Sequence, residues 1–141
     1  MTIVDANVLL YAYDASSSHH DAARRWLERA LSDVAPVRFA WVTILAFLRI
    51  ATSPRILAHP LSLDEATNIV SSWLDRPMCA LIGPAEEHWP TLTRVLAASS
   101  ARGALVMDAH LVTLAVEHGA ALCTFDRDFA RFDGVRVIRP G

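Results

Sequence analysis

The sequence predicts a single α/β/α sandwich, built around a mainly parallel sheet of about five strands with helices on both faces. Short apolar segments alternate with segments of helical periodicity along the whole chain, which is typical of parallel strands joined by helices. A length of 141 residues suits one domain, and no repeat, low-complexity stretch or linker divides it. We therefore expect one domain over residues 1–141.

The predicted strands are short, apolar and rich in residues that favour extended backbone. Thr2–Val4 opens the chain in this way, and Val37, Phe39 and Trp41 alternate with smaller or polar neighbours. The five expected strands span residues 2–4, 37–41, 78–82, 121–124 and 135–138.

The predicted helices are marked by start signals and by apolar residues at helical spacing. Ser18-x-x-Asp21 and Ser62-x-x-Glu65 resemble capping boxes. Residues 84–98 are helical in composition, and Pro90 predicts either a kink in that helix or a late start near residue 88. The helix at 43–52 is apolar nearly all round, as in a buried or interface helix. The five expected helices span residues 19–33, 43–52, 62–75, 84–98 (or 88–98 with the late start) and 104–118.

Composition excludes several classes of protein. Although 53% of the residues are hydrophobic and the mean hydropathy is +0.30, no apolar run reaches the roughly 18 residues of a membrane span. The N-terminus is interpreted as the first strand and not as a signal peptide, so we expect a cytoplasmic protein without a membrane partner. Cys79 and Cys123 lie inside apolar segments, which favours neither a zinc site nor a disulfide.

Four aspartates carry most of the chemical information. Asp5 follows the first strand, Asp126 and Asp128 follow the strand at 121–124, and Asp108 lies near the start of a helix. Parallel strands bring their carboxyl ends to one edge of the sheet, which is where open α/β folds bind ligands. Each aspartate alone could simply cap a helix or a turn. Together they indicate an acidic cluster at one edge.

An acidic cluster needs a positive counter-charge, since two like charges 4 Å apart repel by roughly 1 to 4 kcal/mol. All 13 basic residues are arginine, and none directly neighbours Asp5 or Asp108. A divalent cation is therefore expected, and Mg²⁺ or Mn²⁺ suits carboxylate ligands. The absence of lysine also excludes P-loops and lysine-assisted phosphoryl-transfer sites, so metal-assisted hydrolysis of a phosphodiester remains.

Four segments resemble the motifs of a PIN domain of the VapC toxin type. They are Ile3–Leu9 (IVDANVL), Phe47–Thr52 (FLRIAT), Val106–Leu111 (VMDAHL) and Thr124–Phe129 (TFDRDF). The resemblance covers essentially the whole chain. It implies a PIN-like fold and a Mg²⁺- or Mn²⁺-dependent endoribonuclease that is usually dimeric and is held inactive by a VapB antitoxin.

The same resemblance assigns roles to individual residues. It implies that Asp5, Asp108 and Asp126 are metal ligands and catalytic residues, with Asp128 a fourth catalytic acid or an indirect one. Asn7 could orient Asp5 or a metal-bound water, or it could be an ordinary turn residue.

One position departs from the PIN pattern. Many PIN domains have a glutamate just before the residue matched by Phe47, whereas this chain has Ala46 and no acid anywhere between Val34 and Ser62. The number of metal ions, one or two, is therefore left open. The alternative function is a catalytically weakened PIN-like module that binds a partner through its hydrophobic helix. A flap-type DNA nuclease is a third reading, for which the chain has little room.

The remaining polar and aromatic residues have weaker signals. The candidates for RNA binding are Arg49, Arg55, Arg127 and Arg131, which could equally be ordinary solvated arginines. The four tryptophans are expected to be packing anchors, and the histidines surface or core groups and not ligands. The apolar surplus of the helix at 43–52 and of the Trp26 helix predicts a homodimer and an antitoxin groove.

Overall fold

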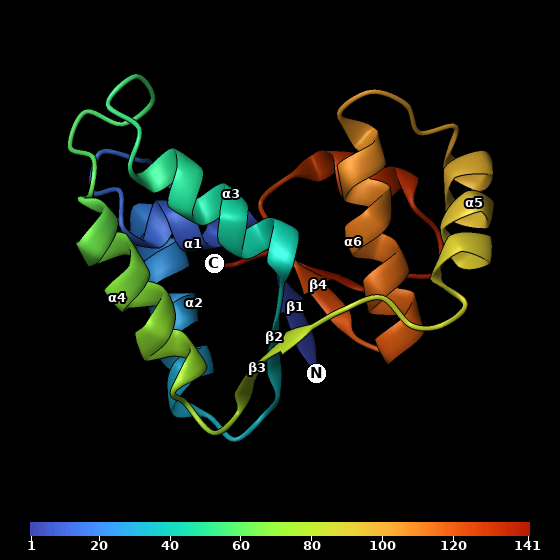
Figure 1. Ribbon diagram of the computed structural model, residues 1–141, viewed down its shortest axis with the longest axis horizontal. Helices are drawn as coiled ribbons and strands as arrows, with labels where there is room; N and C mark the ends of the chain where they lie inside the picture. Colours follow the sequence, from blue (N-terminus) through green and yellow to red (C-terminus); the bar gives the residue numbers. More distant parts are fainter.

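The computed structural model describes all residues from 1 to 141 and contains one sheet of five parallel strands. The strands are β1 (Thr2–Val4), β2 (Val37–Ala40), β3 (Cys79–Ile82), β4 (Ala121–Cys123) and β5 (Val137–Ile138). Their order is β3-β2-β1-β4-β5, so β1 and β4 lie side by side at the centre (Figure 1). Val4 pairs with Cys123, which brings the ends of these two strands together. The predicted α/β/α sandwich with a parallel sheet is confirmed.

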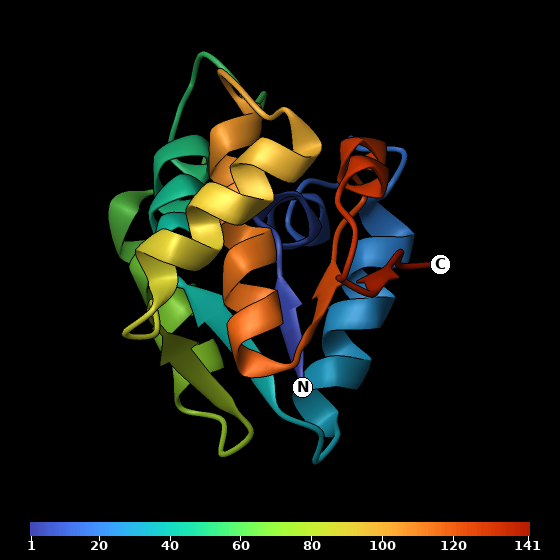
Figure 2. The same ribbon diagram turned by 90° about the vertical axis from the view of Figure 1, so that its right-hand side faces the viewer.

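Helices cover both faces of the sheet, as Figures 1 and 2 show from two sides. On one face lie α1 (Ala6–Ala12), α2 (His20–Ser32), α3 (Trp41–Ala51) and α4 (Leu63–Leu74). On the other lie α5 (His88–Ser99) and α6 (Leu105–His118). Successive strand residues point to opposite faces, so that Val4 packs in the first layer and Ile3 in the second.

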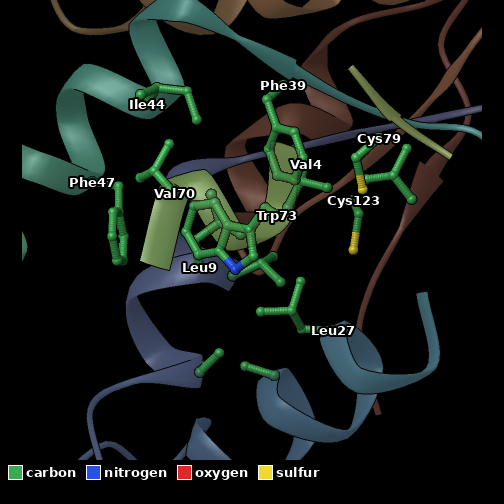
Figure 3. Close-up of a cluster of buried hydrophobic side chains, with 14 of the residues drawn as sticks. Val4, Leu9, Leu27, Phe39, Ile44, Phe47, Val70, Trp73, Cys79 and Cys123 are labelled. Atoms are coloured by element: carbon green, nitrogen blue, oxygen red, sulfur yellow. The ribbon is translucent and has the colours of Figure 1, made fainter. Parts of the chain in front are cut away.

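Trp73 of α4 anchors the larger core layer (Figure 3). Its ring is fully buried, stacks on Phe39 of β2 at 5.5 Å between centroids, and meets Phe47 of α3 edge-on at 4.9 Å. Its indole Nε1 donates a hydrogen bond of 3.2 Å to the Tyr13 hydroxyl. One side chain thus ties three elements together and still satisfies its polar atom.

The predicted elements differ from the structure mainly at their ends. No helix was predicted over Ala6–Ala12, because a two-turn apolar helix after Asp5 looks like the end of a strand and a turn. Trp41 begins α3 and does not end β2, so the helix follows the strand without a loop. The capping box at Ser62 is present, with both of its hydrogen bonds. The one predicted at Ser18 is wrong, since α2 has no side-chain cap.

Two tryptophans are not the packing anchors that the sequence predicts. The side chains of Trp41 and Trp89 are 58% and 70% exposed, whereas Trp73 is buried and Trp26 packs against the edge of the core. Leu45, one turn after Trp41 on the same side of α3, is also 58% exposed. The helix at 41–51 therefore offers an apolar face to solvent. None of the helices combines the length and apolar character needed to cross a bilayer.

Candidate metal centre and nucleic-acid interface

Asp5 lies where β1 ends, and its carboxylate is held in place by three hydrogen bonds. Oδ1 accepts from the backbone N–H of Ala6 at 2.8 Å, which caps α1. Oδ2 accepts from the Thr124 hydroxyl at 2.8 Å and from the Asn7 amide at 3.2 Å. Burial raises the pKa of Asp5, and the bonds from Thr124 and Ala6 oppose that rise. A carboxylate accepts about four hydrogen bonds, so Asp5 retains capacity for one more ligand.

Thr124 joins the ends of the two central strands. Its buried hydroxyl donates to Asp5 and accepts from the Asn7 amide at 3.1 Å and from the backbone N–H of Asp126 at 3.0 Å. Asn7 completes the link, because its Oδ1 accepts from the N–H of Phe125 at 3.1 Å. Asn7 thus contacts the Asp5 carboxylate, and its predicted orienting role stays a prediction. Thr124 was not predicted, because nothing distinguishes it in sequence from a strand-ending threonine.

Arg139, close to the C-terminus, supports the same turn from the other side. Its Nη1 donates to the carbonyl oxygen of Phe125 at 2.6 Å, and its guanidinium lies 5.4 Å from the centre of the Phe125 ring. Together with the bond from Phe125 N–H to Asn7, this fixes both backbone polar groups of Phe125, the residue before Asp126. This contact could not be predicted from the sequence, because Arg139 and Phe125 are 14 residues apart.

Asp108, in the first turn of α6, is the acid with the most perturbed ionisation. Burial raises its pKa to about 6, helped by the negative charges of Asp5, Asp126 and Asp128 and opposed by Arg131. Its carboxylate makes no hydrogen bond, in contrast to those of Asp5 and Asp126. A part-buried carboxylate with acidic neighbours and no donor is a strong candidate for contact with a cation.

Asp126 and Asp128 follow β4 and begin the short 3₁₀ helix η1 (Arg127–Arg131). Asp126 Oδ1 accepts from the backbone N–H of Asp128 at 2.8 Å, while its other oxygen is free. The side chain of Asp128 is exposed and makes no hydrogen bond, yet its charge raises the pKa of Asp108. The two residues therefore shape the turn and also belong to the acidic cluster.

A pocket of about 200 Å³ opens beside Asp5 and Asp108, and α3 forms its opposite wall. Ala46 lines this pocket, so the position that is glutamate in many PIN domains does face the acidic cluster. Thr43 also lines it, with a buried hydroxyl that has no hydrogen-bond partner. The carboxylate donors and this free hydroxyl suit a hard divalent ion. However, no three acidic, histidine or cysteine side chains lie close enough together in the structure to hold one metal ion. The predicted three-aspartate ligand set stays a prediction.

Three of the four candidate arginines lie near the acidic cluster. Arg49 lines the pocket with Asp5 and Asp108, Arg127 lines a neighbouring cleft with Asp126, and Arg131 lies close enough to Asp108 to favour its ionised form. Arg55 lies in the exposed turn after α3 and is not brought to the cluster by any contact.

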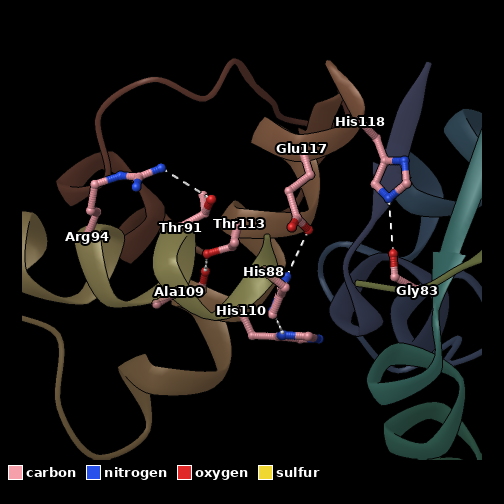
Figure 4. A network of polar contacts seen from close by, with 9 residues as sticks. All are labelled: Gly83, His88, Thr91, Arg94, Ala109, His110, Thr113, Glu117 and His118. Carbon is pink, nitrogen blue, oxygen red and sulfur yellow. Dashed lines mark hydrogen bonds and ion pairs between the residues drawn. The ribbon is translucent and has the colours of Figure 1, made fainter. Parts of the chain in front are cut away.

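A histidine pair links α5 to α6 (Figure 4). His88 Nδ1 lies 2.8 Å from the Glu117 carboxylate, and His88 Nε2 lies 3.0 Å from His110 Nδ1. Burial and the neighbouring His88 lower the pKa of His110. The two histidines are thus part-buried groups that hydrogen-bond to protein partners. Their partners are 22 and 29 residues away in sequence, so the sequence could not identify them.

The sequence matches one protein family and is similar to proteins of known class. The family model described as the PIN domain matches residues 2–135. Ribonuclease VapC37 of Mycobacterium tuberculosis is 46% identical over 140 residues, which cover 99% of this chain and 97% of that protein. Ribonuclease VapC48 of the same species is 37% identical over 137 residues, covering 96% and 94% of the two chains.

Solved structures share the fold at low sequence identity. The VapBC2 complex of Rickettsia felis, bound to a promoter DNA fragment, contains a chain with a TM-score of 0.71 and 13% identity, with coverage of 99% and 98%. VapC20 of M. tuberculosis, described as a toxin that cleaves the sarcin-ricin loop, has a TM-score of 0.68 and 16% identity, with coverage of 96% and 99%. The family match across residues 2–135 and the near full-length identity to VapC proteins show that this chain belongs to the PIN domain family and, within it, to the VapC type.

Proposed function

We propose that this chain is a metal-dependent endoribonuclease and the toxin of a toxin–antitoxin pair. The observation that carries the proposal is the acidic edge, where Asp5 and Asp108 line one pocket and Asp126 follows β4, the strand paired with β1. Burial and the charges of Asp5, Asp126 and Asp128 raise the pKa of Asp108 to about 6. Neighbouring carboxylates in this state are stabilised by a cation. The relatives named ribonuclease VapC support RNA as the substrate.

Asp5, Asp108 and Asp126 would hold the ion, which we propose to be Mg²⁺ or Mn²⁺. When bound, such an ion supplies a water of lowered pKa and neutralises charge on the scissile phosphate. The residues of the chain supply orientation: Thr124 and Asn7 fix the Asp5 carboxylate, and Thr124 also holds the backbone of Asp126. Asp108, which has no protein donor, is the carboxylate freest to respond to the ion.

Sequencing of RNA 5′ ends after induced expression in a bacterial host tests this function. The wild-type chain should arrest growth and create new 5′ ends at a restricted set of sites. The matched control is Asp108→Asn, because this carboxylate makes no hydrogen bond whose loss would disturb the fold. Identical 5′ ends from the two chains would contradict the proposal, and the sites themselves would identify the RNA target.

The second candidate is an interaction module that has lost catalysis, which Ala46 favours because it leaves the pocket without the glutamate that many PIN domains have at this position. Metal binding separates the two functions. Calorimetric titration of Mg²⁺ and Mn²⁺ should give heats for the wild type that are lost in Asp5→Asn and Asp108→Asn. Equal heats in all three proteins would favour the module.

The proposed partners are a VapB-type antitoxin and a second copy of the chain. Structural neighbours include chains from VapBC complexes, which supports an antitoxin of this type. The exposed apolar face of α3, with Trp41 and Leu45, supports an interface. Light scattering should show a dimer at micromolar concentration. Trp41→Ser should weaken it, and a wild-type monomer would contradict the homodimer.

A further inference from the structure

A second cleft, of about 280 Å³, lies outside the acidic pocket. It separates the C-terminal half of α5 from residues 131–134, which follow η1. Figure 2 views this side of the molecule, with α5 lying across α6 and η1 beside them. Its lining includes Arg94, Val95 and Ala98 from α5, and Arg131, Phe132 and Asp133 from the facing segment.

The two arginines of this cleft have no carboxylate partner. The ion pairs of the chain within 4 Å are Arg24–Glu28 and His88–Glu117, so neither Arg94 nor Arg131 is paired with Asp133 across the cleft. Arg94 makes only one long hydrogen bond, of 3.3 Å, to the Thr91 hydroxyl on its own helix. Both guanidinium groups are exposed and available, and guanidinium binds phosphate through paired hydrogen bonds.

The lining of the cleft also includes apolar side chains. Phe132 is buried, Val95 is part-buried and Ala98 is exposed. The volume is at the low end for small-molecule sites, which is adequate for one nucleoside but not for a stacked duplex. An unstacked base with its phosphate needs an apolar surface beside a cation, and bases are unstacked in single strands.

The cleft is connected to the acidic edge through η1. This helix starts next to Asp126 and ends at Arg131, and five residues of 3₁₀ helix span about 10 Å. Arg131 lines the cleft and also lies near enough to Asp108 to act on its charge. An RNA strand that crosses the acidic edge would therefore meet the cleft within a few nucleotides of the scissile phosphate.

We propose that the cleft between α5 and residues 131–134 is a subsite for one nucleotide of single-stranded RNA, with Arg94 and Arg131 on its phosphate and Val95, Ala98 and Phe132 against its base. The proposal rests on the proposed function, because it places the substrate of that site. It adds a position at which the identity of a base next to the cleavage site can be read.

Binding of a labelled random-sequence single-stranded RNA, measured by fluorescence anisotropy in EDTA, tests the subsite without cleavage. Arg94→Gln should weaken binding about 10-fold, as expected for a lost charge-assisted contact. Ala98→Phe, which fills the cleft without changing charge, should weaken it about fivefold. The control Arg25→Gln removes an exposed arginine of α2 that has no partner, and should change the affinity less than twofold.

Two results would overturn the subsite. Folded Arg94→Gln and Ala98→Phe proteins with wild-type affinity would show that RNA does not use the cleft. Equal weakening by Arg25→Gln would show that only net charge matters. Cleavage assays with Mg²⁺ separate this failure from that of the proposed function. If the wild type cleaves RNA and the variants bind RNA with wild-type affinity, only the subsite proposal is wrong. If the wild type neither binds nor cleaves RNA, both the subsite proposal and the proposed function are wrong.

Discussion

Replacing Asp108 with asparagine should stabilise the protein while abolishing cleavage. In the unfolded chain this carboxyl ionises at about pH 4. In the folded chain burial and three neighbouring acids raise its pKa to about 6. Between these values the folded state retains a proton that the unfolded state has released. The free energy of unfolding therefore falls as the pH rises from about 4 to about 6, and stays lower above that.

The size of the effect follows from the same values. A difference of about two units between the folded and unfolded pKa of Asp108 corresponds to about 3 kcal/mol of unfolding free energy. Because Asp108 is only part-buried, solvent screening reduces this to roughly 1 to 2 kcal/mol. Asparagine has a similar shape and no charge, so the Asp108→Asn variant should be more stable by this amount at pH 7.5 and nearly equal to the wild type at pH 4.

Urea unfolding in EDTA at pH 4, 5, 6 and 7.5 measures this difference. The matched control is Asp75→Asn, which changes an exposed carboxylate at the C-terminal end of α4 and should alter stability by less than about 0.5 kcal/mol. Adding Mg²⁺ should raise the stability of the wild type and leave Asp108→Asn unchanged. A variant that is no more stable at pH 7.5, or a difference that does not vary with pH, would refute the reasoning.

Three further predictions concern the support of the site. Thr124→Val should cost about 2 to 4 kcal/mol of unfolding free energy, because Asp5 loses its hydroxyl donor; urea melts should show Thr124→Ser much closer to the wild type, and equal loss in both would contradict the role of the hydroxyl. Arg139→Met should lower the free energy of unfolding by about 1 to 2 kcal/mol and slow RNA cleavage, because the Phe125 carbonyl loses its hydrogen bond. A variant with wild-type stability and wild-type cleavage rate would contradict this. Ala46→Glu should lower the melting temperature in EDTA, at a cost of about 1 kcal/mol, and tighten Mg²⁺ binding in calorimetry, since it adds an acid to the pocket. Unchanged melting and unchanged affinity would place residue 46 outside the site.

The order of strands and helices could be predicted because it rests on local patterns. Apolar segments, Gly119 and the Ser62 capping box mark element ends through backbone rules that act over a few residues. Where two local signals compete, the prediction fails. Asp5 suits a turn and a helix cap equally, and α1 is too short to show a clear period. Trp41 continues the alternation of β2 but starts α3.

The candidate site was predictable only where strand topology determines it. Asp5 and Asp126 follow strands, so their proximity follows from the pairing of β1 with β4. The hydrogen bonds that hold these aspartates could not be predicted from the strand pairing. The bond from Thr124 to Asp5 joins residues 119 positions apart and depends on side-chain orientation at the sheet edge. The exposure of Trp41 could not be predicted either, because the composition of an apolar helix is the same whether it faces a core or a partner.

The most direct test of the central claim is the rate of RNA cleavage by the purified chain as the Mg²⁺ concentration is raised from zero in chelated buffer. The acidic edge predicts no cleavage in EDTA, a rate that rises with Mg²⁺ and saturates, and no cleavage at any concentration by folded Asp108→Asn. Cleavage that persists in EDTA, or that Asp108→Asn retains at the wild-type rate, would contradict a metal-dependent nuclease site at the ends of β1 and β4.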